Sequence, residues 1–402
     1  MNRHVCLLAL ILVAQMTRLS QGGYDPNVLP QGHEYYELRQ GLSNCRLKFE
    51  REKRGRIAFL GGSITASKGW RDDVIRYFQT RFPETEFDFI SAGISSLGSV
   101  PHAFRLQRDV LSHGPVDLLF VEAAVNDTTN TPDRDQMLRG MEGLVRQMRL
   151  QNPLVDIVHL HFVMPEHMRD YSRGMVPASI FQHEKVAVAY GNVSVNLSLE
   201  VTERIAAGEF TWDDDFKNLH PAPFGHALYF NSITRMTEAA FAQPLPQQAL
   251  PHPLPSSPLD ARSYFRGRFG PIEDVRLVRG FQRETAWQPT DGKGTRAGFV
   301  NVPALVGSGP GAEMEFAFEG TAVGLFITAG PDAGVIEYRI DGGETRSIST
   351  FTPWSQGLHL PWAVLLDDGL APGKHTVNIR ISTELAPQAT GSALRVFHLL
   401  LN

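Results

Sequence analysis

A serine that follows two glycines is the first indication of chemistry in this sequence. Residues 59–65 read Phe-Leu-Gly-Gly-Ser-Ile-Thr and lie between an apolar run and a segment with helical periodicity. Glycine allows a sharp backbone turn, so Ser63 would lie where a strand ends and a helix begins. Open α/β sheets place their sites at this edge, and a helix N-terminus favours developing negative charge. The turn alone fits two interpretations, a functional serine or a serine that caps the helix.

Three further segments occupy equivalent places along the chain. Residues 91–99, rich in glycine and serine, follow the second apolar run, and residues 122–127 follow the third. Residues 219–226 open the last segment of helical period. Because the carboxyl ends of parallel strands meet at one edge of a sheet, we expect the four segments to converge around Ser63.

Together the four segments resemble the four sequence blocks of the SGNH/GDSL hydrolase superfamily, in order and in spacing. The match is closest to the branch whose first block reads Gly-Gly-Ser-Ile-Thr, which includes many polysaccharide acetyl esterases. The resemblance implies that Ser63 is the nucleophile. It also implies that His220 is the base, which takes the serine proton and returns it to the leaving alcohol. His226, about a turn and a half along the helix, is the alternative base.

The resemblance further implies an oxyanion hole. Its donors would be the backbone N–H of Ser63, a second backbone N–H from the glycine block, and the side-chain amide of Asn126. The position that usually holds the second donor, a glycine, aligns with Ser96, whereas Gly98 lies two residues later. Because the donor is a backbone N–H, either residue can supply it.

The catalytic acid departs from the family pattern. The family usually has an aspartate three residues before the histidine, where this chain has Lys217. The nearest acids are Asp213, Asp214 and Asp215, and Asp215 is our choice because a two-residue bulge could bring its carboxylate to Nδ1 of His220. A dyad supported by a backbone carbonyl is the alternative. Either partner would leave Nε2 free to accept the serine proton.

Two kinds of hydrophobic pattern divide the chain. Up to about residue 243, short apolar runs at 57–60, 87–90, 118–121 and 157–160 alternate with segments of helical period, which predicts helices around a parallel sheet. With the resemblance, the expected fold is α/β, a flavodoxin-like three-layer sandwich. Beyond a proline-rich stretch, apolar and polar residues largely alternate at 298–302, 313–318, 335–340 and 376–381, which predicts an antiparallel β-sandwich.

These patterns, together with the resemblance, predict five segments along the chain. They are a signal peptide at 1–22, an N-terminal extension at 23–55, an SGNH hydrolase domain at 56–242, a semi-rigid proline-rich linker at 243–262 and a β-sandwich accessory domain at 263–402. The expected location is therefore secreted or periplasmic. Cys6 would be removed with the signal peptide, which leaves Cys45 without a partner for an internal disulfide.

Several kinds of partner are excluded at this stage. The net charge of −5 and the scattered basic residues argue against nucleic acid. No apolar run approaches the roughly 20 residues that a membrane-spanning helix needs. Four histidines, at 159, 161, 167 and 183, lie on different elements without the spacing of metal ligands, so we expect neither a metal nor an organic cofactor.

The sequence thus predicts a secreted serine esterase that hydrolyses a small acyl ester, acetyl by preference, on a carbohydrate. The expected partner is accordingly an acylated carbohydrate. Two alternatives remain open. One is a lipase or thioesterase of the same superfamily, and the other is a carbohydrate-binding or adhesive protein whose hydrolase domain is inactive, which the misplaced acid motivates.

Overall fold

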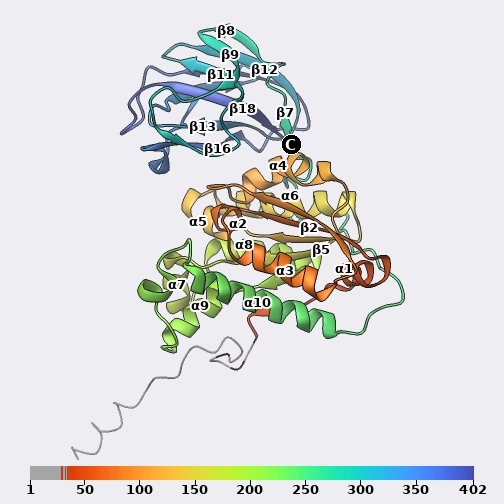
Figure 1. The fold of residues 1–402 in the computed structure, drawn as a ribbon. Helices are drawn as coiled ribbons and strands as arrows, with labels where there is room; N and C mark the ends of the chain where they lie inside the picture. Colours follow the sequence, from red (N-terminus) through yellow and green to blue (C-terminus); the bar gives the residue numbers. More distant parts are fainter. Residues whose placement is uncertain (1–28, 30–31, 33) are drawn as a thin grey trace, which may run out of the picture.

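The computed structural model describes residues 29, 32 and 34–402 and divides them into an α/β part and a β-rich part (Figure 1). The signal peptide expected at residues 1–22 lies outside the described residues. Among the residues that are described, no helix combines the length and the apolar character needed to cross a bilayer.

The α/β part is built on one six-stranded sheet. Its strand order is β1 (Tyr36–Glu37), β6 (Val193–Val195), β5 (Asp156–Leu160), β4 (Leu118–Val121), β2 (Arg54–Gly61) and β3 (Glu86–Gly93). The four apolar runs predicted as strands lie in β2, β3, β4 and β5, and these strands are parallel to their neighbours.

The sheet has the expected parallel strands and is mixed at one edge. Strand β1 pairs antiparallel with β6, with Tyr36 opposite Val195. This strand comes from the segment expected to be an N-terminal extension. A strand of two residues is too short to show the alternation of apolar and polar residues that predicts a strand. Strand β1 nevertheless covers the open edge of β6.

Helices cover both faces of this sheet, as the alternation along β2 indicates. Ile57 and Phe59 pack with α3 (Trp70–Arg81) and α10 (Pro223–Ala242), whereas Ala58 and Leu60 pack with α4 (Ser99–Asp109) and α6 (Arg134–Gln151). The helices of this part are α1 (Ser43–Leu47), α2 (Ser63–Ala66), α3 (Trp70–Arg81), α4 (Ser99–Asp109), α5 (Ala124–Asn130), α6 (Arg134–Gln151), α7 (Pro165–Ser172), α8 (Ala178–Tyr190), α9 (Leu197–Ala206) and α10 (Pro223–Ala242), with short helical turns η1 (Lys48–Glu52), η2 (Leu111–His113) and η3 (Trp212–Phe216).

The β-rich part consists of two sheets that share one core. Leu325 and Val396 of the first sheet pack in the same buried cluster as Phe316 and Ile379 of the second. The first sheet contains β7 (Arg268–Gly270), β9 (Phe281–Trp287), β10 (Gly294–Thr295), β11 (Val302–Ser308), β13 (Val323–Ala329), β16 (Leu358–Asp367) and β18 (Ala393–Leu401). The second contains β8 (Arg276–Arg279), β12 (Glu313–Gly320), β14 (Val335–Ile340), β15 (Arg346–Ser349) and β17 (Gly373–Ile381), and a short turn, η4 (Pro353–Ser355), precedes β16.

One predicted strand of this part is wrong. Residues 298–302 form a turn in which Gly298 and Asn301 have φ values of 83° and 56°, and the strand begins only at Val302. The other three predicted segments lie in β12, β14 and β17. Pairs are antiparallel except between β10 and β16, which are parallel. The architecture is otherwise the expected two-layer β arrangement.

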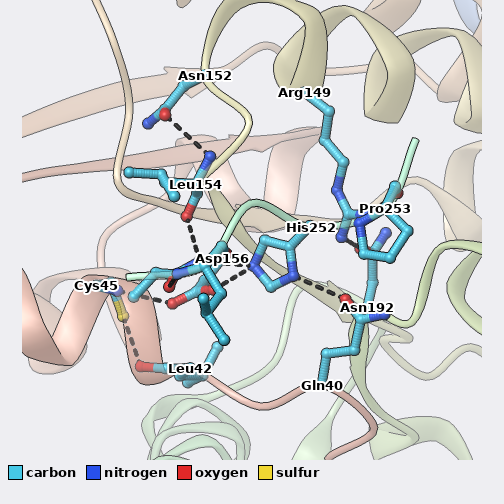
Figure 2. Close-up of polar contacts among 12 residues, drawn as sticks. Gln40, Leu42, Cys45, Arg149, Asn152, Leu154, Asp156, Asn192, His252 and Pro253 are labelled. Carbon is cyan, nitrogen blue, oxygen red and sulfur yellow. Dashed lines mark hydrogen bonds and ion pairs between the residues drawn. The ribbon is translucent and has the colours of Figure 1, made fainter. Parts of the chain in front are cut away.

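The proline-rich segment lies against the α/β part and is hydrogen-bonded to it (Figure 2). His252 places Nε2 2.7 Å from Oδ1 of Asp156 and Nδ1 2.7 Å from Oε1 of Gln40. Arg149 donates from Nη1 to the carbonyl of Pro253 at 2.8 Å. Because proline-rich segments form neither helices nor sheets, their backbone carbonyls lack regular backbone hydrogen bonds. Here side chains of the α/β part donate hydrogen bonds to such carbonyls.

The two parts meet on helix α4, above which the β-rich part lies in Figure 1. Val100 and Phe104 of this helix are buried in one apolar cluster with Phe299, Phe326 and Phe397 of the β-rich part. The helix begins directly after Gly98. The β-rich part therefore packs against the element that follows the predicted oxyanion segment.

Candidate active site

The structure brings Ser63 and His220 together although 157 residues separate them. Oγ of Ser63 lies 2.6 Å from Nε2 of His220. Ser63 is the first residue of α2, directly after β2, and His220 lies in the loop before α10. The backbone N–H of His220 donates to Oδ1 of Asn218 at 2.8 Å, which helps to hold this loop. The hydroxyl and the imidazole are thus in the geometry that a nucleophile and its base require.

The two glycines before Ser63 are needed for space rather than for an unusual φ. Neither Gly61 nor Gly62 has a positive φ. A Cβ at Gly62 would lie 2.0 Å from Oδ1 of Asn126, and one at Gly61 would lie 2.3 Å from Oγ1 of Thr65. Glycine therefore lets the nucleophile turn approach the neighbouring segments closely.

The segments that carry the predicted oxyanion donors lie beside the nucleophile turn, because Oδ1 of Asn126 and the carbonyl oxygen of Leu97 lie within 4 Å of a Cβ placed at Gly62. In the described part of the chain, the backbone N–H groups of Ser63, Ser96 and Gly98 have no hydrogen-bond acceptor, and neither does the side-chain amide of Asn126. Ser96 has a left-handed backbone, with φ of 72°, and its carbonyl accepts from Nδ2 of Asn130 at 2.8 Å. The geometry leaves both Ser96 and Gly98 able to supply the second N–H.

The expected contact between Asp215 and His220 is not made. Oδ2 of Asp215 instead accepts from the backbone N–H of Thr211 at 2.8 Å and from its hydroxyl at 3.4 Å. Asp215 lies in the helical turn η3, which directs its carboxylate back onto Thr211. Within residues 34–402, no carboxylate hydrogen-bonds Nδ1 of His220, and this includes Asp213 and Asp214.

The imidazole of His220 is held in its neutral form. Its pKa lies below the ordinary value, first because surrounding protein atoms displace water and second because the positive charge of Arg296 acts on it. Arg296 follows β10 and belongs to the β-rich part. A neutral imidazole can accept the proton of Ser63 at neutral pH.

His226, the alternative base, has a different place. Its Nδ1 accepts from the backbone N–H of Trp70 at 3.3 Å, and its ring fills the space beside Gly69. Gly69 has φ of 139°, so the chain bends there around the imidazole. His226 thus anchors the start of α3 and does not contact Ser63 in this arrangement.

The four conspicuous histidines each have a protein partner. His161 lies 2.7 Å from Glu184, and His183 lies 2.8 Å from Asp127. His167 is hydrogen-bonded to Thr128 at 2.9 Å, and His159 to Asn192 at 3.0 Å. Among the described residues, no group of three or more histidine, cysteine or acidic side chains is arranged to hold a metal ion.

Sequence reasoning missed two buried carboxylates of the third block. Glu122 lies beneath the nucleophile turn, and Asp127 accepts from the backbone N–H of Ser99 at 2.8 Å while it pairs with His183. Both acids are almost fully buried. Their position beside a buried strand was the available signal, because acids in such places are rarely unpaired.

A pocket of about 290 Å³ opens between the two parts of the chain next to Ser96 and Gly98, the candidate oxyanion donors. Ser96, Gly98 and Asn130 line one side, and Trp362 and Ile348 of the β-rich part line the other. The space beside Ser96 and Gly98 is therefore bounded by both parts.

Comparison with known proteins finds one family match and several similar folds. The GDSL-like lipase/acylhydrolase family model matches residues 59–228. The crystal structure of a two-domain esterase active on acetylated mannans is similar, with a TM-score of 0.74, 22% identity and coverage of 90% of this chain and 96% of that one. A second crystal structure, of a two-domain esterase active on acetylated mannans and co-crystallized with mannopentaose, is also similar. Its TM-score is 0.72, its identity is 20%, and the match covers 91% of this chain and 98% of that one. No curated protein matches the chain.

The structural likeness extends over both parts of the chain and concerns the fold. The sequence match covers the segment that contains Ser63, Asn126 and His220. Residues 59–228 thus match the GDSL-like lipase/acylhydrolase family, and the similar two-domain esterases share the fold of the chain.

Proposed function

We propose that this protein is a secreted serine esterase that removes a small acyl group, acetyl by preference, from an acylated polysaccharide. The observation that carries the proposal is the 2.6 Å contact between Oγ of Ser63 and Nε2 of His220 beside unpaired amide donors. An alcohol, a neutral imidazole and unpaired N–H groups at one point are the components that acyl transfer requires.

The reaction proceeds through an acyl-enzyme. Oγ of Ser63 attacks the ester carbonyl carbon while Nε2 of His220 takes its proton. The carbonyl oxygen becomes negative and accepts hydrogen bonds from the N–H of Ser63, from the amide of Asn126 and from the N–H of Ser96 or Gly98. The carbon–oxygen bond to the sugar breaks as His220 protonates the departing alcohol.

Water completes the cycle. His220, neutral again, takes a proton from water as the water oxygen attacks the acyl carbon, and the bond to Ser63 breaks with return of the proton to Oγ. The products are the free sugar hydroxyl and acetate. In this proposal Ser63 and His220 act as a dyad, because Asp215 is bonded to Thr211.

Three observations support a polysaccharide as the substrate. The similar two-domain esterase is described as active on acetylated mannans. The pocket beside Ser96 and Gly98 is shared with the β-rich domain, and Trp362 gives it an aromatic wall on which a sugar ring can pack. The sequence of residues 1–22 has the layout of a secretory signal, which suits a polymer outside the cell.

The test compares the wild type with Ser63→Ala. We expect the wild type to release acetate from acetylated mannan or acetylated xylan and to hydrolyse p-nitrophenyl acetate, and Ser63→Ala to do neither. Equal rates for the two proteins would reject the enzymatic proposal. Release from p-nitrophenyl acetate alone, with no acetylated glycan cleaved, would reject the carbohydrate substrate.

A carbohydrate-binding protein without activity is the second candidate. The observation that favours it is the lack of a carboxylate on Nδ1 of His220 among residues 34–402. Binding of acetylated mannan by calorimetry, without acetate release by either protein, would support this candidate over the esterase.

A further inference from the structure

We propose that Glu122 is a positioning residue that fixes the peptide between Gly62 and Ser63, so that the N–H and Oγ of Ser63 face the same carbonyl group. This inference rests on the proposed function. Glu122 would not touch the substrate and would act only through the nucleophile turn.

The contacts of the carboxyl group place it directly beneath this turn. Oε1 of Glu122 accepts from the backbone N–H of Gly62 at 2.5 Å and from Oγ1 of Thr65 at 3.0 Å. Gly62 and Thr65 lie on either side of Ser63 in sequence. One carboxylate oxygen therefore ties together the residue before the nucleophile and the first turn of α2.

The N–H of Gly62 depends on this acceptor. Strand β2 ends at Gly61, whose carbonyl accepts from Ile94, so Gly62 is the first residue beyond the sheet ladder. Both Gly62 and Glu122 are buried, so water cannot replace the carboxylate. A buried N–H without an acceptor is costly, and the turn would move to find another partner.

Space around the carboxyl group is restricted as well. A Cβ at Gly61 would lie 2.4 Å from Oε1 of Glu122. The backbone carbonyl of Glu122 is also held, because Nε2 of His102 lies 3.2 Å from it. The backbone and the carboxyl group of Glu122 are thus both held in place, as a positioning residue requires.

Charged and titratable groups from three helices face Glu122. They are Arg105 on α4, with its neighbour His102, Asp127 on α5 and Tyr229 on α10. Burial raises the pKa of Glu122 to about 7, against the opposing effect of its bonds to Gly62 and Thr65 and of the charge of Arg105. The carboxyl group can therefore be neutral or charged near pH 7, and it can accept from Gly62 in both forms.

Two variants of Glu122 separate the length of the side chain from its charge. Glu122→Gln keeps the length of the side chain and an oxygen acceptor but removes the charge. Glu122→Asp keeps the charge but withdraws the oxygen by about one carbon–carbon bond, about 1.5 Å. If positioning is the role, the glutamine variant works and the aspartate variant does not.

The experiment measures kcat and KM with p-nitrophenyl acetate for the full-length wild type and both variants. For Glu122→Asp we expect kcat to fall by about ten- to a hundredfold with KM within about threefold, because a displacement near 1 Å can cost about a hundredfold. For Glu122→Gln we expect kcat within about threefold of the wild type. The reverse order, with an active aspartate and an inactive glutamine variant, would overturn the inference, as would wild-type kcat in both.

Glu142 supplies a matched control. It is also fully buried and accepts from the hydroxyl of Tyr190 at 2.6 Å and from the N–H of Leu259 at 2.5 Å, on α6 and away from Ser63. Glu142→Asp is expected to lower the melting temperature without a selective loss of kcat. An equal kcat loss per folded molecule in Glu142→Asp and Glu122→Asp would show that any buried glutamate has this effect and would overturn the inference.

The same assay separates this inference from the proposed function. If the wild type and Ser63→Ala are equally inactive, the proposed function fails. If the wild type is active, Ser63→Ala is inactive and Glu122→Asp retains wild-type kcat, only the role of Glu122 fails.

Discussion

Removing the side-chain amide of Asn126 is the most direct test of the oxyanion site. The side chain lies beside the nucleophile turn, where its Oδ1 would be 2.0 Å from a Cβ at Gly62. Its amide has no hydrogen-bond partner in the part of the chain that the structure describes. Asn126→Ala therefore leaves no protein group unpaired, and we expect the free energy of unfolding to change by less than about 0.5 kcal/mol.

The effect on catalysis should be much larger. Loss of one oxyanion donor typically costs about 3 kcal/mol of transition-state stabilisation, which corresponds to about a hundredfold or more in kcat. KM should change little, because the ground-state carbonyl oxygen carries less charge than the oxyanion. The variant thus separates transition-state stabilisation from folding.

The assay is steady-state hydrolysis of p-nitrophenyl acetate together with thermal unfolding of the same samples. Asn152→Ala is the control, since Nδ2 of Asn152 donates to the carbonyl of Val116 at 2.7 Å at the end of α6. We expect this control to lose stability and keep its kcat. A kcat for Asn126→Ala within about threefold of the wild type would refute the assignment of Asn126 to the oxyanion hole.

Three further results are expected. Activity should fall as the pH drops through the pKa of His220, which lies below its ordinary 6.5. Arg296→Ala should raise this pKa and move the acid limb of kcat/KM to higher pH, and an unchanged limb would contradict the effect of the Arg296 charge on His220. Asp215→Asn should keep kcat within about threefold and lower the melting temperature slightly, because Asp215 bonds Thr211; a hundredfold kcat loss would restore it as the catalytic acid. Phe104→Ala, in the cluster shared by the two domains, should cost about 3–5 kcal/mol in denaturant unfolding, and a loss below about 1 kcal/mol would contradict the shared core.

The shared core also bears on what the β-rich domain does. Helix α4 begins after Gly98, which is a candidate oxyanion donor, and its apolar face is covered by Phe299 and Phe326. The same helix carries Arg105, which donates to the carbonyl of Gly61 at 3.2 Å. The domain that bounds the pocket thus also supports the backbone around the nucleophile.

The central strands and the candidate residues Ser63 and His220 could be predicted from local patterns in the sequence. The runs at 57–60 and 118–121 are apolar at every position because both faces of the sheet are covered, and this pattern is local. Ser63 and His220 could be chosen because each lies in a short motif at the end of a strand or the start of a helix. Strand β1 could not be predicted, because two residues have no period.

The acids near the candidate site could not be predicted from the sequence, because their positions depend on how distant segments fold and pack. Asp215 is close to His220 in sequence, yet η3 turns its carboxylate onto Thr211. Glu122 is 59 residues from Ser63 in sequence, yet its carboxyl group reaches the N–H of the residue before it. A side chain's direction depends on the φ and ψ of its own turn and on the neighbours that compete for its oxygens, and neither is encoded in spacing along the chain.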